Sequence, residues 1–496
     1  MALIGLRVMT YGITVNQSLA MILALTVLGI WSFNKVHGLI AGLIFFVVKP
    51  VIVRAAFAVD LSLNSSGGLD LLGMTPAVLL AVLIVWQIYS EASSGKRLMQ
   101  GRTRTLLTVL VGLSLLSVLN PASSIMVGLG GFERNILPNM MILFAVAYLL
   151  GRLEDTDKFV KSLLLLGVVS CIYAIGQYWL GLYSWEKDWM RHVAFKDSMN
   201  GWLTIGLRGV EFRIFSVFYN YMDFTFSNVL VFSLVLAWGR QWKGGWNVLR
   251  RCYFACWAIV LVLTLERTPM LMTAVGAFAI YYLSGSPVRR KVLIWTAGIS
   301  TALVIGGLNI AAPHLKNTGA DKFIRLAELA NPFQAGSIQD RVERKWAPTL
   351  EIIAANPLGV GIGFGSQTKV NDVARQSDYW VEPHNEILQK TLETGIAGGL
   401  VYLLLLISVF QDSRRLLRCS GNIGRLGMGM IAATLGYWLC GMVNIPFSGA
   451  SGILYWTTAG VVIAAVENNH AAAEHLTNDR TPSTAVIKQP TNGVTA

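Results

Sequence analysis

The sequence predicts an all-α, polytopic integral membrane protein with about 12–14 transmembrane helices and one long, partly helical external loop. Of its 496 residues, 54% are hydrophobic and 14% are charged, whereas an average soluble protein carries roughly 25% charged residues. Apolar runs of bilayer-crossing length recur along the chain, and basic residues gather in alternate connections between them. These observations exclude a disordered chain, a collagen, a small disulfide scaffold and a set of soluble domains.

The candidate spans are expected to be helices, because a backbone exposed to lipid must satisfy its own hydrogen bonds. The first run follows Arg7 and lacks a small-x-small cleavage site, so we expect a retained helix. The second is interrupted by Lys49-Pro50 and Arg54, which predicts either a broken helix or a tight hairpin. The segments are 18–33, 37–59, 73–90, 105–119, 136–151, 159–181, 214–239, 252–265, 268–284, 292–312, 387–411, 427–443 and 452–466.

The net charge of +13 indicates the orientation of these spans. Short cytoplasmic loops of membrane proteins carry an excess of Lys and Arg. The basic connections, predicted to be cytoplasmic, are 91–104, 152–161, 240–251, 289–291 and 412–425. The nearly neutral connections, predicted to be external, are 120–135, 182–213, 266–267 and 312–385. The charge is therefore a topology signal, and no nucleic-acid partner is expected.

Four regions follow from this topology. Residues 1–311 and 386–466 contain the N-terminal and C-terminal transmembrane helices, 312–385 form the large external loop, and 467–496 form a cytoplasmic tail that we expect to be disordered. The external loops contain no cysteine, so no external disulfide is expected. Cys252 and Cys256 share a helix face, but no further ligands stand beside them, which favours packing over a zinc site.

The loop 312–385 is longer than a plain connection requires, which indicates a function. Helical spacing predicts surface helices over 321–329 and 338–355. The segment 356–365 carries glycines at alternate positions, which predicts tight turns or a close approach of backbones. A nucleotide phosphate loop is disfavoured, because the closing Lys-Ser/Thr pair is missing and the segment is predicted to face outward, away from ATP.

Three polar clusters near the predicted external boundary are candidate site residues. His384 is either an interfacial residue beside a helix start, which it or Asn385 caps, or a general base. Arg267 is either paired with its neighbour Glu266 or holds a phosphate through its planar fork of donors. Asp223, inside an apolar segment that follows Arg208 and Arg213, is either functional or part of a buried ion pair.

The aromatic residues around 178–202 are interpreted mainly as an interfacial belt, with stacking on sugar rings as the alternative. The external clusters contain no plausible set of metal ligands. Arginines at headgroup depth beside a potential base suit a lipid pyrophosphate donor, since pyrophosphate is already a good leaving group and charge stabilisation can replace a metal.

Four segments of the sequence resemble the O-antigen ligase and O-antigen polymerase superfamily of bacterial membrane glycosyltransferases. Residues 383–399 look like the family's His-Asn-x-x-Leu and Glu-x-Gly-x-x-Gly stretch. Residues 356–365 resemble its Pro-x-x-Gly-x-Gly element, with Arg341 and Trp346 ahead of it. Residues 265–268 are similar to its Ser-Arg-Gly element, and 208–220 to the opening of the preceding external span. The likeness covers most of residues 105–466.

The resemblance implies transfer of a glycan from undecaprenyl pyrophosphate to an acceptor hydroxyl, with inversion and without a metal or other cofactor. The site would face the periplasm from the bacterial inner membrane. His384 would activate or orient the acceptor hydroxyl. The pyrophosphate would be held by Arg267 with Arg208 or Arg213, and Arg341 would assist. We expect Asn385, Glu266 and Asp223 to support these groups, although Glu266 and Thr268 stand where the family usually has Ser and Gly.

The resemblance leaves the acceptor open. We favour a polymerase of exopolysaccharide or O-antigen repeat units over a ligase that transfers glycan to lipid A–core, or an enzyme that modifies protein hydroxyls. The expected partners are a lipid-linked oligosaccharide donor, a glycan or lipid-linked acceptor, membrane lipids and other polysaccharide assembly proteins. The alternative outside enzymes is a membrane transporter, which would be expected to have related halves. No internal repeat is evident.

Overall fold

The computed structural model describes residues 15–59, 89, 93, 101–120, 125–149, 153–189, 203–206, 209–218, 220–264, 266–299, 339, 341–364, 383–419 and 421–478. Within them, the N-terminal helices are α2 (Val15–Phe33), α3 (Lys35–Val59), α5 (Arg102–Val118), α6 (Ile125–Asn135), α7 (Leu137–Leu149), α8 (Leu153–Leu180) and α9 (Ser184–Trp189). The strands β1 (Leu203–Gly206) and β2 (Gly209–Phe212) pair as an antiparallel hairpin with Leu203 opposite Phe212.

The C-terminal half is also helical. Its elements are α10 (Tyr221–Trp238), the 3-10 turn η4 (Gly239–Gln241), α11 (Gly244–Thr264), α12 (Arg267–Ser284), the π-helical turn η6 (Val342–Trp346), α16 (Ala347–Ala355), α18 (Glu386–Leu416), α19 (Asn422–Gly441) and α20 (Gly449–Asn478). A further helical stretch covers 287–299.

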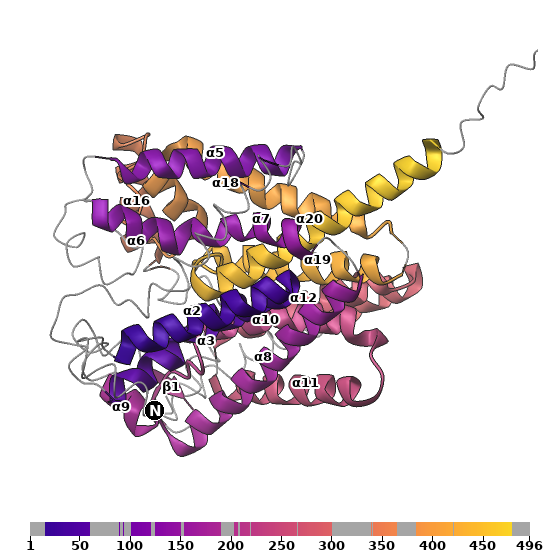
Figure 1. Cartoon of the computed structure of the whole chain (residues 1–496), viewed down its shortest axis with the longest axis horizontal. Helices are drawn as coiled ribbons and strands as arrows, with labels where there is room; N and C mark the ends of the chain where they lie inside the picture. The colour runs from indigo at the N-terminus through magenta and orange to yellow at the C-terminus, as the bar shows by residue number, and fades with distance from the viewer. Residues whose placement is uncertain are drawn as a thin grey trace, which may run out of the picture.

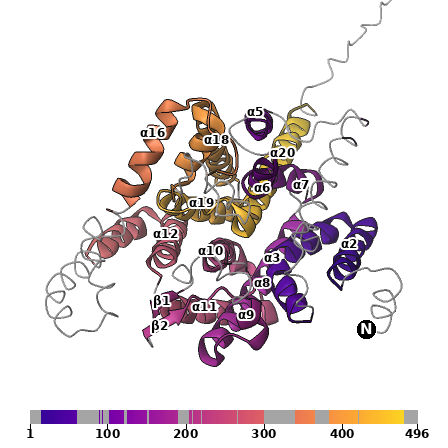
Figure 2. The same ribbon diagram turned by 90° about the vertical axis from the view of Figure 1, so that its left-hand side faces the viewer.

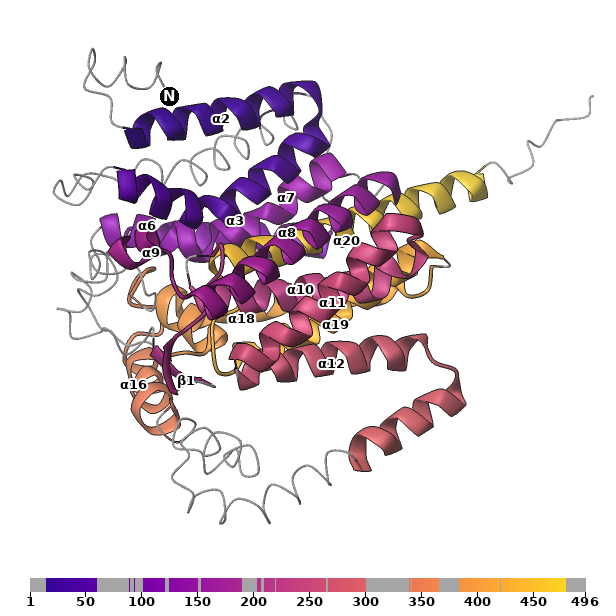
Figure 3. The same ribbon diagram turned by 90° about the horizontal axis from the view of Figure 1, so that it is seen from below.

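The long helices form a bundle whose helices run roughly along the longest axis of the molecule (Figure 1) and are seen nearly end-on in Figure 2. α10 and α19 pack against each other in the middle of the bundle, and α20 packs most extensively against α7. Thirteen of the eighteen residues of α10 are buried, as expected for a helix surrounded by other helices. Figure 3 shows α2 at one edge of the bundle and α12 toward the other.

Five of the described helices are long and apolar enough to cross a membrane, by length and composition: Glu154–Leu180, Tyr221–Gln241, Gly244–Thr264, Glu386–Leu416 and Gly449–Asn468. The prediction of an all-α polytopic membrane protein is confirmed, with one small hairpin added. The total of about 12–14 spans stays a prediction, because 73–90 lies mostly outside the described residues.

The structure refines several predicted elements. α3 is a single helix that contains Pro50, so the predicted hairpin over 37–59 does not form. The hairpin β1–β2 lies in the predicted external loop 182–213, and α6 lies in the predicted connection 120–135. The predicted helix 338–355 is present over 342–355, beginning with a π-helical turn. The predicted helix 321–329 lies outside the described residues.

The predicted tail also begins later than expected. α20 continues through Asn478, whereas the disordered tail was predicted from residue 467. The helical pattern continues through Ala471, Ala472 and Ala473, and alanine has the highest helix propensity. The remainder of the predicted tail, 479–496, lies outside the described residues.

The described parts of the two sets of predicted connections lie at opposite ends of the bundle. We call the end that carries α9, the hairpin and α16 the site end; it lies at the left of Figure 1. There Asn120 Nδ2 donates to the Gly359 carbonyl over 3.0 Å. At the opposite end, the basic end, Arg102 donates to Gln411 Oε1 over 3.2 Å and the Trp242 indole to Asp157 Oδ1 over 2.7 Å. This alternation is what the charge pattern predicted.

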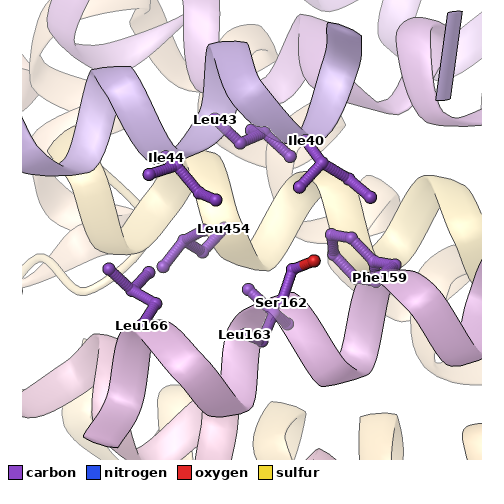
Figure 4. A pocket seen from close by; sticks show the side chains of 8 residues that line it. All are labelled: Ile40, Leu43, Ile44, Phe159, Ser162, Leu163, Leu166 and Leu454. Atoms are coloured by element: carbon purple, nitrogen blue, oxygen red, sulfur yellow. The ribbon is translucent and has the colours of Figure 1, made fainter. Parts of the chain in front are cut away.

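A small apolar recess lies between α3, α8 and α20 (Figure 4). Ser162 supplies the polar atom among its lining residues, which are otherwise Ile40, Leu43, Ile44, Phe159, Leu163, Leu166 and Leu454.

Candidate functional site at the helix N-termini

Three helices, α10, α12 and α18, begin at the site end. Asn220 caps α10 by accepting from the Asp223 amide over 2.8 Å, and Asn385 caps α18 by accepting from the Leu388 amide over 3.0 Å. Each helix N-terminus presents unpaired N–H groups and the positive end of the helix dipole. The site end is therefore suited to binding an anion.

The first cationic group is built around Arg213, directly after the hairpin. Its guanidinium lies 3.7 Å from Glu266 Oε1 and stacks over the Tyr221 ring, with 4.2 Å to the ring centroid. Glu266 is the N-cap residue of α12 and Arg267 is its first residue. Arg213, far from Glu266 in the sequence, thus lies beside the residue that directly precedes Arg267.

Arg341 connects this group to His384. Its charge acts on the Tyr221 hydroxyl together with those of Arg213 and Glu266, and it also acts on the His384 imidazole. Lys345, one turn further along, acts on His384 as well. The structure therefore brings Arg213, Arg341 and His384 within electrostatic reach of one another through Tyr221 and Arg341, and Arg267 follows Glu266 at the start of α12. Arg208 lies outside the described residues.

His384 lies in an unusual local environment. Its backbone is in the left-handed region, with φ +47, a conformation that costs a non-glycine residue energy and is frequent at functional sites. Burial, and then the positive charges of Lys345 and Arg341, lower the pKa of His384 to about 3. At neutral pH the imidazole is therefore uncharged and has a lone pair that can accept a hydrogen bond.

Asn385 and Asp223 have structural contacts. Besides capping α18, Asn385 donates through Nδ2 to the Met442 carbonyl at the end of α19 over 3.0 Å. Asp223 accepts from Asn220 Nδ2 over 3.0 Å and from Ser451 Oγ over 3.3 Å. These bonds join the beginning of α10 to α20 and the beginning of α18 to α19. Both residues thus support the site by fixing the helices that surround it.

The glycine-rich loop 356–364 is packed against the first turns of α18. The Val360 amide donates to the Leu392 carbonyl over 2.9 Å, and the Ile396 amide to the Pro357 carbonyl over 3.0 Å. Gly359 has φ +89, and a Cβ there would lie 2.5 Å from the Gly395 nitrogen. The prediction of a close backbone approach is confirmed. Because the loop continues from α16, this contact fixes Arg341 and Lys345 relative to His384.

Sequence reasoning missed a buried polar network beneath this loop. Lys390 donates to the Asn135 carbonyl over 2.9 Å and lies 3.8 Å from Glu386 Oε1. Asn135 Nδ2 donates to Glu393 Oε2 over 2.9 Å, and the Gly363 amide donates to Glu393 Oε1 over 3.2 Å. All four side chains are at most 1% exposed. The sequence contained a sign of this network, because ionisable residues inside an apolar span are rare and usually paired.

Metal ligation has no support in the described part of the chain, where no group of three or more His, Cys, Asp or Glu side chains is placed to hold an ion. The five cysteines are free thiols, and Cys171 and Cys440 are buried as packing residues. What the site end offers chemically is a neutral imidazole beside several cations at helix N-termini. This arrangement can bind a strong anion and orient a hydroxyl group next to it.

Fold and site define a multi-pass helical membrane protein with a cationic site at one end of the bundle. Residues 252–403 match the sequence model of a family described as O-antigen ligase. The match covers less than a third of the chain and includes Arg267, Arg341 and His384. It supports the O-antigen ligase and O-antigen polymerase superfamily, and with it a bacterial glycosyltransferase-type enzyme that acts on lipid-linked glycans. A search of curated proteins found no match to the chain.

Proposed function

We propose that this protein transfers a glycan from undecaprenyl pyrophosphate to a sugar hydroxyl at the periplasmic face of the inner membrane. The observation that carries the proposal is the convergence of Arg213, Arg341 and the Arg267-bearing start of α12 beside His384. Arginine matches the oxygens of a phosphate through paired hydrogen bonds. A lipid-linked pyrophosphate is the anion that a site at the membrane boundary would meet.

In the proposed reaction, the acceptor hydroxyl attacks the anomeric carbon from the face opposite the pyrophosphate, so the configuration is inverted. The new bond joins the acceptor oxygen to the anomeric carbon, and the bond from that carbon to the phosphate oxygen breaks. The arginines stabilise the negative charge that develops on the leaving pyrophosphate. His384 accepts the proton of the attacking hydroxyl.

Binding of the donor would also raise the pKa of His384. In the free protein the pKa of His384 is about 3, because of burial and the charges of Lys345 and Arg341. A bound pyrophosphate brings negative charge next to the same cations, which raises the proton affinity of the imidazole. Proton acceptance is then favoured only when the donor occupies the site.

The direct test is transfer in proteoliposomes that contain the purified protein and a synthetic undecaprenyl-pyrophosphate oligosaccharide. His384→Ala is expected to lower the rate by about 10²–10⁴-fold, and Arg267→Ala by about 10²–10³-fold. Arg251→Gln, on the exposed surface of α11 toward the basic end, is the matched control and should transfer at the wild-type rate. Wild-type transfer by both site variants, at equal amounts of folded protein, would contradict the proposal.

The acceptor is addressed by gene disruption. We favour the polymerase, for which loss of long surface chains with persistence of lipid-linked single repeats is expected. Accumulation of long lipid-linked chains that stay unattached would instead indicate the ligase. Unchanged surface glycans with altered solute uptake would indicate a transporter and reject the enzyme proposal.

A further inference from the structure

Arg54 and Glu186 form a completely buried ion pair at the site end, outside the segment 252–403 that matched the family. Arg54 lies in α3 and Glu186 in α9, with 1% and 0% of their side chains exposed and 3.3 Å between Nη1 and Oε1. A buried charge is expensive unless it is paired and hydrogen-bonded. The other groups that are hydrogen-bonded to Arg54 and Glu186 therefore indicate what the ion pair does in the structure.

Arg54 also donates to the short turn formed by residues 216–218, called the Ser216 turn. Its Nη2 donates to the Ser216 carbonyl over 2.9 Å and to the Phe218 carbonyl over 3.1 Å. Its guanidinium also stacks on the Phe215 ring, 4.5 Å from the centroid. Ser216 has φ +55, a left-handed conformation that surrounding contacts must maintain in a residue other than glycine. Arg54 supplies two of these contacts.

The other contacts reach the same turn from α8. Gln177 Oε1 accepts from the Ser216 amide over 2.8 Å, and Ser216 Oγ donates to the Ser170 carbonyl over 2.6 Å. Gln177 Nε2 in turn donates to Glu186 Oε1 over 2.8 Å. Arg54, Glu186 and Gln177 thus form one connected set, and Ser216 is held from α3 and from α8.

The turn connects the two parts of the first cationic group. Arg213 precedes it directly, and Tyr221, on whose ring Arg213 stacks, begins the helix that follows it. Rotation of the turn would therefore move Arg213 relative to both Tyr221 and Glu266. The position of Arg213 depends on the conformation that Arg54 holds.

Stability alone does not account for such a pair. Replacement of a buried ion pair by well-packed apolar residues is often neutral or stabilising, because the desolvation of two charges offsets their attraction. An apolar pair would fill the same space, but it would leave the Ser216 and Phe218 carbonyls without donors. What arginine contributes here is a planar fork that binds two carbonyls in a fixed geometry.

We infer that Arg54, held by Glu186, is a positioning residue that sets Arg213 for binding of the anionic donor. This inference rests on the proposed function. It extends the site to α3 and α9, and it predicts a defect in donor binding rather than in the chemical step. We expect replacement of Arg54 to leave the step at His384 unchanged.

The test is a double-mutant cycle with the purified full-length protein in proteoliposomes and the synthetic undecaprenyl-pyrophosphate oligosaccharide as donor. Arg54→Met combined with Glu186→Gln removes both charges together, so neither is left buried alone. We expect the donor KM to rise about 10-fold with kcat changed less than about 3-fold. In an Arg213→Gln background the same pair of substitutions should cause no further rise, because both act through one arginine.

A second variant tests the inference if the Arg54/Glu186 variant does not fold. Gln177→Met removes the hydrogen bond to the Ser216 amide and leaves both charges in place, and we expect a smaller rise in donor KM, about 3-fold. The inference would be overturned if the Arg54/Glu186 substitutions raised the donor KM equally in the wild-type and Arg213→Gln backgrounds. It would also be overturned if they lowered the yield of folded protein and left the donor KM unchanged. Wild-type transfer by His384→Ala and Arg267→Ala would instead reject the proposed function itself.

Discussion

Two arginine–glutamate pairs lie at the site end, and they differ in almost every physical respect. The pair of Arg54 and Glu186 is fully buried, separated by 3.3 Å and surrounded by hydrogen-bond partners. The pair of Arg213 and Glu266 is separated by 3.7 Å, and each side chain is about a fifth exposed, at 20% and 21%. The Oε1 atom of Glu266 accepts no hydrogen bond within the described structure.

The difference shows how one residue type serves two purposes. Four donor contacts commit the buried arginine to its own protein, so no ligand can reach it. The partly exposed arginine has a long contact with a carboxylate that a phosphate can replace. A buried arginine whose donors bind its own chain is a scaffold residue, whereas a partly exposed arginine can also reach a ligand.

The largest expected effect is on stability at the buried pair. Arg54→Ala leaves Glu186 charged and without its cation in the interior, which should cost about 3–5 kcal/mol of unfolding free energy. Thermal unfolding in detergent would detect the loss as a clear fall in melting temperature. If the single substitution were tolerated without such a fall, the buried pair would not be the scaffold described above.

At the pair of Arg213 and Glu266, we expect a small effect on stability and a large effect on transfer. Arg213→Ala should lower the unfolding free energy less than Arg54→Ala does, because its contact with Glu266 is longer and both side chains are about a fifth exposed. Transfer at low donor concentration should nevertheless fall by about 10–100-fold, because a charge-assisted contact to the pyrophosphate is lost. Unfolding and transfer are measured on the same preparation. A large stability loss with normal transfer would reverse the assignment of the two pairs.

The pH dependence of stability concerns the neighbouring His384. Its pKa is about 3 in the folded protein, below the ordinary value of about 6.5, so the unfolded chain binds the proton first. The stability that this residue contributes is complete above about pH 6.5 and is lost as the pH falls toward 3, at up to about 1.4 kcal/mol per unit.

Melting temperatures measured between about pH 4.5 and 7 should show this slope in the wild type and a shallower one in His384→Asn. Asparagine is a suitable replacement because it tolerates the left-handed backbone. Parallel slopes in the two proteins would mean that the site does not hold the imidazole uncharged.

The smallest expected effect is at Glu266. Because this carboxylate competes with the donor for Arg213, Glu266→Gln should lower the donor KM by about 2–5-fold and change stability by less than about 0.5 kcal/mol. Donor titrations in proteoliposomes measure the change, with Arg251→Gln as the control for altered surface charge. A raised KM would show that Glu266 orients Arg213 rather than competing for it.

The fold was largely predictable, because apolar length and the distribution of basic residues act on each segment separately. The alternation of connections between the two ends needed only local counts of charge. Other features depend on partners far along the chain. Arg54 was visible only as an interruption of an apolar run, and its partners Glu186 and Ser216 are more than a hundred positions away. Helical periodicity contains no information about such contacts.

The candidate site shows the same division. His384, Arg267 and the glycine-rich loop carry short motifs, so they could be proposed directly. The sequence left open whether Arg208 or Arg213 joins Arg267 at the pyrophosphate. The structure places Arg213 3.7 Å from Glu266, the residue before Arg267, whereas Arg208 lies outside the described residues. The roles of Lys345 and Tyr221 could not be predicted. They follow from the way that α10 and η6 meet at the site end, which depends on tertiary packing.

The break at Gly395 has a consequence for how the protein responds to its bilayer. Gly395 has φ 78 and ψ 174 inside α18, so this span consists of two rods joined at a non-helical residue. A Cβ there would lie 2.7 Å from the Leu358 carbonyl carbon, which ties the joint to the glycine-rich loop. Transmembrane helices tilt to match the thickness of the surrounding lipid. The joint therefore allows the longer rod to tilt with the thickness of the bilayer without the same rotation of the short rod that follows His384, which the glycine-rich loop contacts.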